Sequence, residues 1–293
     1  MKRKWIRRVS WILLTPVLLF VILMILLYIP PVQNLLRREV TAYASKATGM
    51  QIQVERIDLR FPLNLLVRGV EVIQQPDTLL SLESLNVRVQ AWPLVKGKVE
   101  VDEVTLSQVA FNSANLIEGM KIKGVLGRFF LQSHGVDLSN ELAVINQTEL
   151  SDTHVQMLMN DTTTTPKDTT ASAPVNWKVD LHKLKLKNVS FSMQLPADSM
   201  RMAAHIGEAF INDAQADLKN QFYSLKQFLL SGGSANYDTG AAKPVEGFDA
   251  SHIAVRDIRI GLDSLLYKGR DMNAVLREFS MNERSGLSIT SLA

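Results

Sequence analysis

The pattern of hydrophobic and polar positions changes character twice along the chain. An uncharged apolar run extends from Val9 to Ile29, interrupted only by Ser10, Thr15 and Pro16. A helix needs about 20 apolar residues to span the hydrocarbon core of a bilayer, and this run supplies them. The pattern therefore predicts a transmembrane signal anchor over residues 9–29.

The flank of this run predicts its orientation. Residues 1–8 carry five basic side chains and no acidic one: Lys2, Arg3, Lys4, Arg7 and Arg8. A cleaved signal peptide also begins with basic residues, but its apolar core is about 7–15 residues long and ends at an A-x-A-like site. The first A-x-A sequence, at 42–44, lies well beyond the apolar run, which favours a retained anchor. The positive-inside rule then predicts a single-pass protein with residues 1–8 in the cytoplasm and the bulk of the chain exported.

A helical period continues over residues 30–49. Pro30-Pro31 is predicted to end the anchor helix, and Gly49 to end the next one. Apolar residues then recur on one helical face: Val32, Leu35, Leu36, Val40, Tyr43, Ala44 and Ala47. Such an amphipathic helix could lie on the membrane surface or pack against the following domain, and packing is the simpler expectation.

From residue 50 onward the period becomes two, which is typical of half-buried β-strands. Turn signals separate the alternating segments, as at Gln75-Pro76-Asp77 and Lys96-Gly97-Lys98. The pattern predicts a mainly β protein built on a long, bent antiparallel sheet. The parity of the apolar positions changes after Val101 and again after Leu106, and we interpret each change as a β-bulge.

A degenerate repeat runs through these strands. Each copy has an apolar residue, a polar one, then Gly, Asp, Asn or Gln, then an alternating pair. The copies are Val67–Val72, Leu106–Phe111, Leu150–Val155, Leu186–Phe191 and Val255–Ile260. Recurrence of one strand unit favours an extended, repetitive sheet, although any β-rich chain can produce such matches.

Two less regular segments divide and end the β region. Residues 160–174 are rich in Thr, Ser and Pro and are predicted to form a disordered loop or hairpin tip. They separate a first β segment at 50–159 from a second at 175–293. Residues 198–217 allow either strand or helix. Alternation continues to Leu292, so either the last strand pairs inside the fold or the chain continues in a longer protein, and we favour the second.

Composition excludes several kinds of chemistry. There is no cysteine, hence no catalytic thiol, disulfide or Cys-ligated zinc, and a disulfide-free exported chain suits a bacterial periplasm. The net charge of +3 lies largely in the anchor flank, so a nucleic-acid partner is not expected. The five histidines have no zinc-like spacing. The adjacent Asp102 and Glu103 would face opposite sides of a strand. We expect no enzyme activity and no cofactor.

The apolar strand faces therefore become the candidate site. A wide sheet must cover its hydrophobic face with a second layer, a helix, a membrane or a ligand. Composition alone does not choose between a closed core and an open groove that holds acyl chains.

The chain resembles the AsmA/TamB superfamily over about residues 1–115. The resemblance lies in the anchor and in the segments Leu35–Gly49, Ile52–Leu59, Val67–Val72, Asp77–Leu85 and Trp92–Val101. The Thr-rich loop and the lack of the family's C-terminal domain depart from the family pattern. The resemblance implies a taco-like β-groove rooted in the inner membrane, which lets phospholipid cross the periplasm to the outer membrane.

Two hypotheses follow from this resemblance. In the first, phospholipid acyl chains lie on a groove lined by Ile52, Val54, Leu85, Val87, Val89, Val99 and Val101. In the second, the chain is an anchored envelope scaffold that docks an outer-membrane barrel protein through its sheet edge and carries no lipid. The resemblance provides no catalytic residues.

Overall fold

A computed structural model describes residues 29–60, 63–90, 93, 100–137, 140–159, 176–197, 199–240, 243, 245–269 and 271–292. The predicted anchor at 9–29, apart from its last residue, and the predicted loop at 160–174 lie outside these residues. Within them, no helix is long and apolar enough to cross a membrane.

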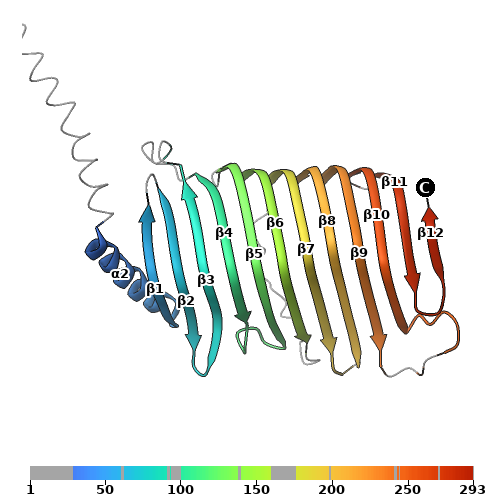
Figure 1. Ribbon diagram of the computed structural model, residues 1–293, viewed down its shortest axis with the longest axis horizontal. Helices are drawn as coiled ribbons and strands as arrows, with labels where there is room; N and C mark the ends of the chain where they lie inside the picture. The colour runs from blue at the N-terminus through green and yellow to red at the C-terminus, as the bar shows by residue number, and fades with distance from the viewer. Residues whose placement is uncertain are drawn as a thin grey trace, which may run out of the picture.

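The described residues form one helix followed by a single sheet of twelve strands (Figure 1). The mainly β prediction is thus confirmed, and the two predicted β segments belong to one sheet. The elements are α2 (Pro30–Thr48), β1 (Gln51–Arg60), β2 (Asn64–Gln74), β3 (Asp77–Val89), β4 (Val101–Asn112), β5 (Met120–Asp137), β6 (Leu142–Met159), β7 (Lys178–Leu195), β8 (Met200–Asp217), β9 (Phe222–Thr239), β10 (His252–Lys268), β11 (Asp271–Glu283) and β12 (Ser288–Leu292). The ambiguous segment at 198–217 is therefore mostly strand β8.

The strands follow chain order across the sheet, and all neighbours are antiparallel except β6 and β7. The prediction of a wholly antiparallel meander is wrong at this pair, where Leu142 aligns with Lys178 and Leu158 with Gln194. Parallel neighbours need a connection that returns along the strands, which a hairpin cannot provide. Strands β6 and β7 are therefore parallel neighbours and not the two arms of a hairpin.

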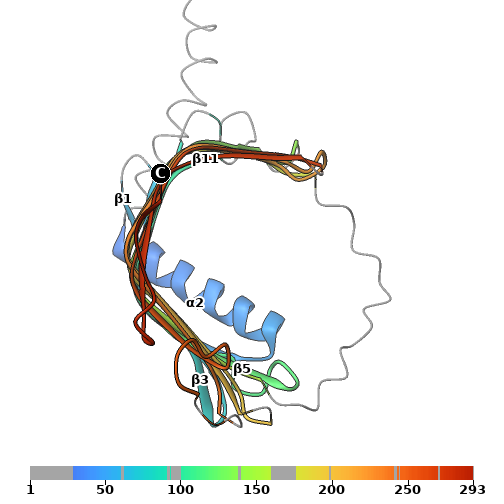
Figure 2. The same cartoon turned by 90° about the vertical axis from the view of Figure 1, so that its right-hand side faces the viewer.

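The sheet is strongly bent, and its strands follow a C-shaped curve when seen from the β12 end (Figure 2). Six strands contain a residue with a left-handed backbone on one line across the sheet. These residues, with their φ angles, are Gly69 (58°), Gln108 (50°), Asp152 (52°), Asn188 (52°), Gly232 (64°) and Asp257 (56°). Such a residue interrupts the extended backbone. Glycine adopts this conformation without steric cost, and Asn and Asp tolerate it better than other residues.

Five of these six residues occupy the third position of the sequence repeat. Each copy of the repeat therefore marks a place where a strand passes through a left-handed residue. The apolar residues two before and one after the left-handed residue face the same side, as Leu186 and Val189 do around Asn188. The parity change at Gln108 is therefore a left-handed corner, because the register of β4 with both neighbours passes it without a shift. Interpreting it as a bulge was wrong.

The earlier parity change does mark a β-bulge. Arg88 pairs with Glu103 but Val89 pairs with Val101, so Asp102 is the extra residue on β4. The two carboxylates of this acidic pair also have separate partners. Asp102 accepts a hydrogen bond from the Gln90 side chain at 2.8 Å, and Glu103 pairs with Arg88 at 3.2 Å.

The sheet is a single layer over the described residues. Each strand contacts its neighbours in the sheet, and α2 contacts β1. Only four apolar residues in this part of the chain are buried, namely Leu79, Leu82, Ala143 and Ala209, and no large side chain is fully buried. A second layer would have produced a continuous buried core.

Helix α2 covers the outer edge of β1 with polar side chains. Gln33 donates to the carbonyl of Leu59 at 3.2 Å, and Arg37 donates to that of Glu55 at 2.7 Å. The hydroxyl of Ser45 accepts from the backbone N–H of Ile52 at 3.0 Å. The helix ends as predicted, at Gly49 in a left-handed conformation. Capping in this way satisfies backbone groups that an edge strand leaves unpaired.

Candidate functional site: the concave apolar face

The register of the strands aligns apolar residues into rows that cross the sheet. The first, which we name the Leu85 row, is apolar at every position from β1 to β11. Its members are Ile57, Val67, Leu85, Leu106, Phe129, Leu150, Leu186, Ala209, Leu230, Ile260 and Phe279. Because paired residues in neighbouring strands point to the same face, these side chains form one uninterrupted apolar ladder.

A second ladder, the Val87 row, runs beside the first and contains one polar residue, Thr148. Its members are Leu59, Leu65, Val87, Val104, Leu131, Thr148, Leu184, Ile211, Phe228, Leu262 and Leu276. The two rows lie on the same side of the left-handed corners.

Two further rows lie across the corners on the same face. The Leu82 row contains Val54, Val70, Leu82, Val109, Leu126, Thr153, Val189 and Ile206. The Ile52 row contains Ile52, Val72, Leu80, Phe111, Gly124, Val155, Phe191, Ala204, Ala235 and Val255. Four parallel apolar rows therefore cover most of the width of the sheet.

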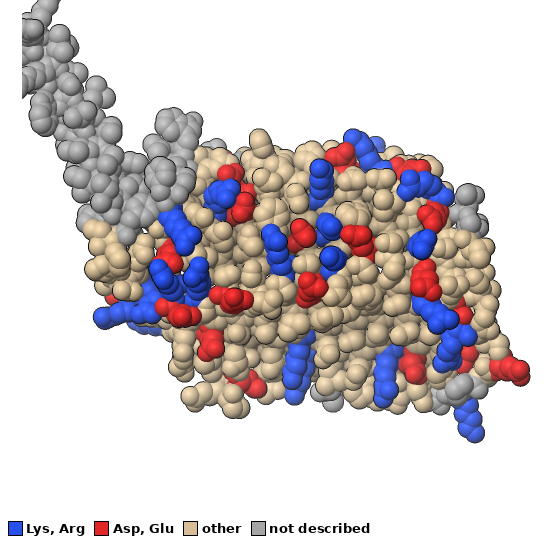
Figure 3. Space-filling model, viewed as in Figure 1, with Lys and Arg blue, Asp and Glu red and all other residues tan. Residues whose placement is uncertain are grey.

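Charged side chains occupy the opposite, convex face. Figure 3 shows this face, with Lys, Arg, Asp and Glu distributed over the strands. Some of them pair across strands, as Lys185 does with Glu208 at 3.4 Å. Since successive side chains of a strand alternate between faces, the apolar rows between these charges face the concave side of the sheet.

The structure brings six of the seven predicted lining residues to this concave face. Ile52, Val54, Leu85 and Val87 belong to the four rows, and Val89 pairs with Val101 one step farther along. All six are half-buried. The seventh, Val99, lies outside the described residues.

Sequence reasoning missed the larger part of the face, which lies on β5 to β11. The members on these strands, such as Phe129, Leu186 and Leu230, show the same alternation as the predicted ones. The signal was present in the repeat, whose first position contributes Leu106, Leu150 and Leu186 to the Leu85 row. What was missing was the register that aligns them.

The concave face is large and partly open to solvent. Twelve strands spaced by about 4.8 Å give it a length of roughly 50 Å along the row of strands. Its side chains retain exposed apolar area because, apart from α2 at β1, no other described element packs on them. Removal of this area from water is favourable, so the face has the physical properties of a binding surface for an apolar ligand.

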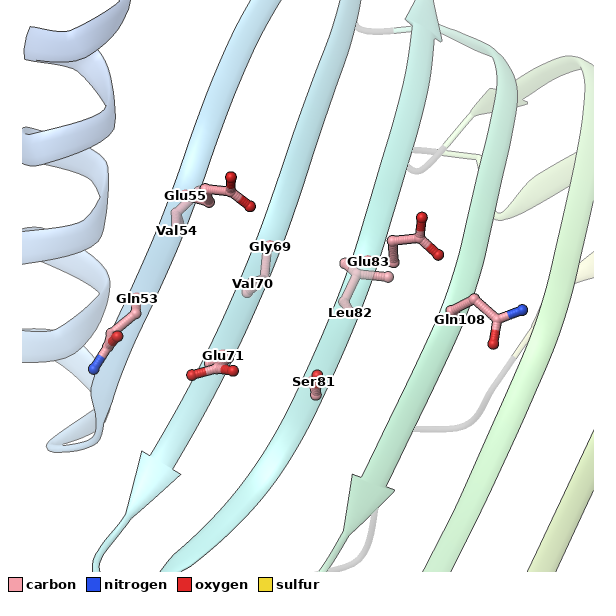
Figure 4. A pocket seen from close by; sticks show the side chains of 10 residues that line it. All are labelled: Gln53, Val54, Glu55, Gly69, Val70, Glu71, Ser81, Leu82, Glu83 and Gln108. Carbon is pink, nitrogen blue, oxygen red and sulfur yellow. The ribbon is translucent and has the colours of Figure 1, made fainter.

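The convex face carries a polar hollow of about 570 Å³ over β1 to β4 (Figure 4). Its charged lining is acidic: Glu55, Glu71 and Glu83. The Glu55 side chain lies over Gly69, where a Cβ would come within 2.6 Å of its Oε2 atom. Gly69 thus supplies both the left-handed backbone and the space for Glu55.

The most buried titratable cluster has a structural role. The Nδ1 atom of His252 lies 2.8 Å from the Asp249 carboxylate. A hydrogen bond from the backbone N–H of Val245, with others from Ser251 and His252, keeps the pKa of Asp249 below its usual value. These contacts fix the residues that precede β10. Within the described residues, no three His, Cys, Asp or Glu side chains are arranged to hold a metal ion.

Comparison of the chain with protein-family models and with curated proteins finds no match.

Proposed function

We propose that this chain is an inner-membrane-anchored periplasmic groove protein that carries phospholipid between the inner and outer membranes. The lipid acyl chains would rest on the concave apolar rows while the headgroup stays in water. The observation that supports this proposal is the uninterrupted Leu85 row from β1 to β11, on a face that no second layer covers among the described residues. The orientation, with residues 1–8 in the cytoplasm, follows from the sequence of the predicted anchor.

The energetics favour a track over a single tight site. Each acyl CH₂ group moved from water to an apolar surface gains roughly 0.8 kcal/mol. The rows present Val, Leu, Ile and Phe side chains of similar character along their length, so the gain changes little from one strand to the next. No strand therefore holds the lipid in a deep free-energy minimum, and the lipid can move along the rows.

The test is lipid content measured by mass spectrometry on the full chain purified gently in detergent. We expect phospholipid to co-purify with the wild-type protein and to be lost from Val87→Asp, because a carboxylate in the Val87 row opposes acyl-chain contact. The matched control is Ser84→Asp, on the same strand but on the convex face and paired with Arg68. Circular dichroism checks the fold of both variants. A wild-type protein free of phospholipid, or Val87→Asp with undiminished lipid, would contradict the proposal.

A second function, the anchored scaffold without lipid cargo, is favoured by one specific observation. Strand β12 pairs with β11 only over Phe279–Asn282, and residues 271–278 of β11 are all exposed. Met272 and Val275 on this stretch are 68% and 55% exposed. An edge of this kind can accept an added strand from a partner such as an outer-membrane barrel protein. Absence of lipid together with capture of an added strand would favour the scaffold.

A further inference from the structure

Helix α2 leaves part of its apolar face uncovered. Leu35, Val40 and Tyr43 are 55%, 52% and 77% exposed. The amphipathic pattern favoured packing against the domain, and α2 does pack against β1. It does so through Gln33, Arg37 and Ser45, which hydrogen-bond to the edge strand. Leu35, Val40 and Tyr43 lie on a different side of the helix, because an edge strand offers hydrogen-bonding groups and little apolar surface.

We propose that this apolar face of α2 lies in the surface of the membrane that holds the predicted anchor. The inference rests on the proposed function, since it assumes that anchor. The apolar run ends at Ile29, and α2 begins at Pro30. A helix of 19 residues is about 28 Å long, so all of α2 lies within that distance of the point where the anchor ends.

The chemistry of α2 suits a lipid surface. Interfacial helices carry basic residues beside their apolar side chains. Besides Arg37, which donates to β1, α2 carries Arg38 and Lys46, against one acidic residue, Glu39, which lies between Leu35 and Tyr43 on the helix. Tyrosine is enriched at the level of lipid headgroups, where its ring contacts apolar chains and its hydroxyl stays hydrated. Tyr43 is 77% exposed, more than Leu35 and Val40.

The position of α2 gives this contact a role. The helix lies at the β1 end of the sheet and within the curve of its concave side (Figures 1 and 2). Its contact with the membrane places the first residues of the apolar rows, Ile52 and Val54 on β1, beside a source of lipid. The β1 end is then the point at which lipid enters the concave face.

The experiment exploits the absence of cysteine from the chain. Tyr43→Cys and Asn34→Cys each create one labelling site on an exposed position, and nine residues place the two sites about two and a half helical turns apart, on opposite sides. Each full-length variant is labelled with a fluorophore and reconstituted into phosphatidylethanolamine–phosphatidylglycerol liposomes that contain an acyl-chain nitroxide lipid. We expect the nitroxide to quench the label at 43 by at least about twofold and to leave the label at 34 nearly unchanged.

Two outcomes would overturn the inference. An unquenched label at 43 that aqueous iodide can reach means that this face lies in water. An unquenched label that iodide cannot reach means that protein covers the face, as in a dimer. Lipid bound to the same variants is measured in parallel. Retained phospholipid without quenching contradicts the membrane contact but not the groove, whereas quenching without retained phospholipid contradicts the groove alone.

Discussion

At the scale of single residues, the sheet bends along a line of six residues whose backbone is left-handed, a conformation that most residue types avoid. Gly, Asp, Asn and Gln stand at the six left-handed positions, and no β-branched residue does. The sequence repeat located five of these positions. It did not reveal their geometry, because a parity change in an alternating pattern is produced equally by a bulge and by a left-handed corner.

Asn188 gives the clearest residue-scale prediction. Its φ is 52°, and its side chain donates a 2.7 Å hydrogen bond to Asp152, the left-handed residue of the neighbouring strand. Asn188→Val should lower the free energy of unfolding by about 1–2 kcal/mol, because a β-branched side chain is strained at positive φ. Asn188→Gly, which loses the hydrogen bond but not the conformation, should be the milder change. Thermal unfolding of both variants tests this, and a valine variant as stable as the glycine variant would refute it.

At the scale of elements, the sequence identified the helix, its C-terminal stop and the strand character of the chain. It did not identify the parallel pairing of β6 with β7, because an alternating pattern is the same whichever way a strand runs. It also did not identify the face by which α2 packs. The apolar face was the natural candidate, but an edge strand exposes carbonyl and N–H groups, and Gln33, Arg37 and Ser45 satisfy them.

Arg37 tests this edge contact. Its guanidinium donates to the carbonyl of Glu55 at 2.7 Å and lies 3.4 Å from that of Val54. Arg37→Ala should destabilise the α2–β1 contact by about 1 kcal/mol and speed amide hydrogen exchange in β1. Arg38→Ala is the matched control, since Arg38 is exposed one residue away. Hydrogen-exchange mass spectrometry of β1 peptides provides the measurement, and equal exchange in the two variants would show that Arg37 does not hold the edge.

At the scale of the whole molecule, the sequence predicted that the sheet has an apolar face, but not that this face extends from β1 to β11. Alternation placed Ile52 with Val54, and Leu85 with Val87, on the same side of their own strands, but that the two pairs share one face follows from the register. The extension to β11 follows from a register that keeps apolar residues opposite each other across every neighbouring pair, including the parallel one. Register is a property of paired strands, so no single strand segment contains it.

A continuous track and a discrete lipid site predict different responses to the same substitution. If lipid moves along the rows, an acidic residue far from β1 should block delivery between two vesicle populations as strongly as one near it. Leu230→Asp, on β9 in the Leu85 row, should therefore reduce the transfer rate to about the same level as Val87→Asp on β3, because each inserts a charge that acyl chains must pass. Asn236→Asp, on the convex side of β9, should leave the rate unchanged. Strong inhibition by Val87→Asp with none by Leu230→Asp would show that lipid binds near β1 and does not travel the length of the sheet.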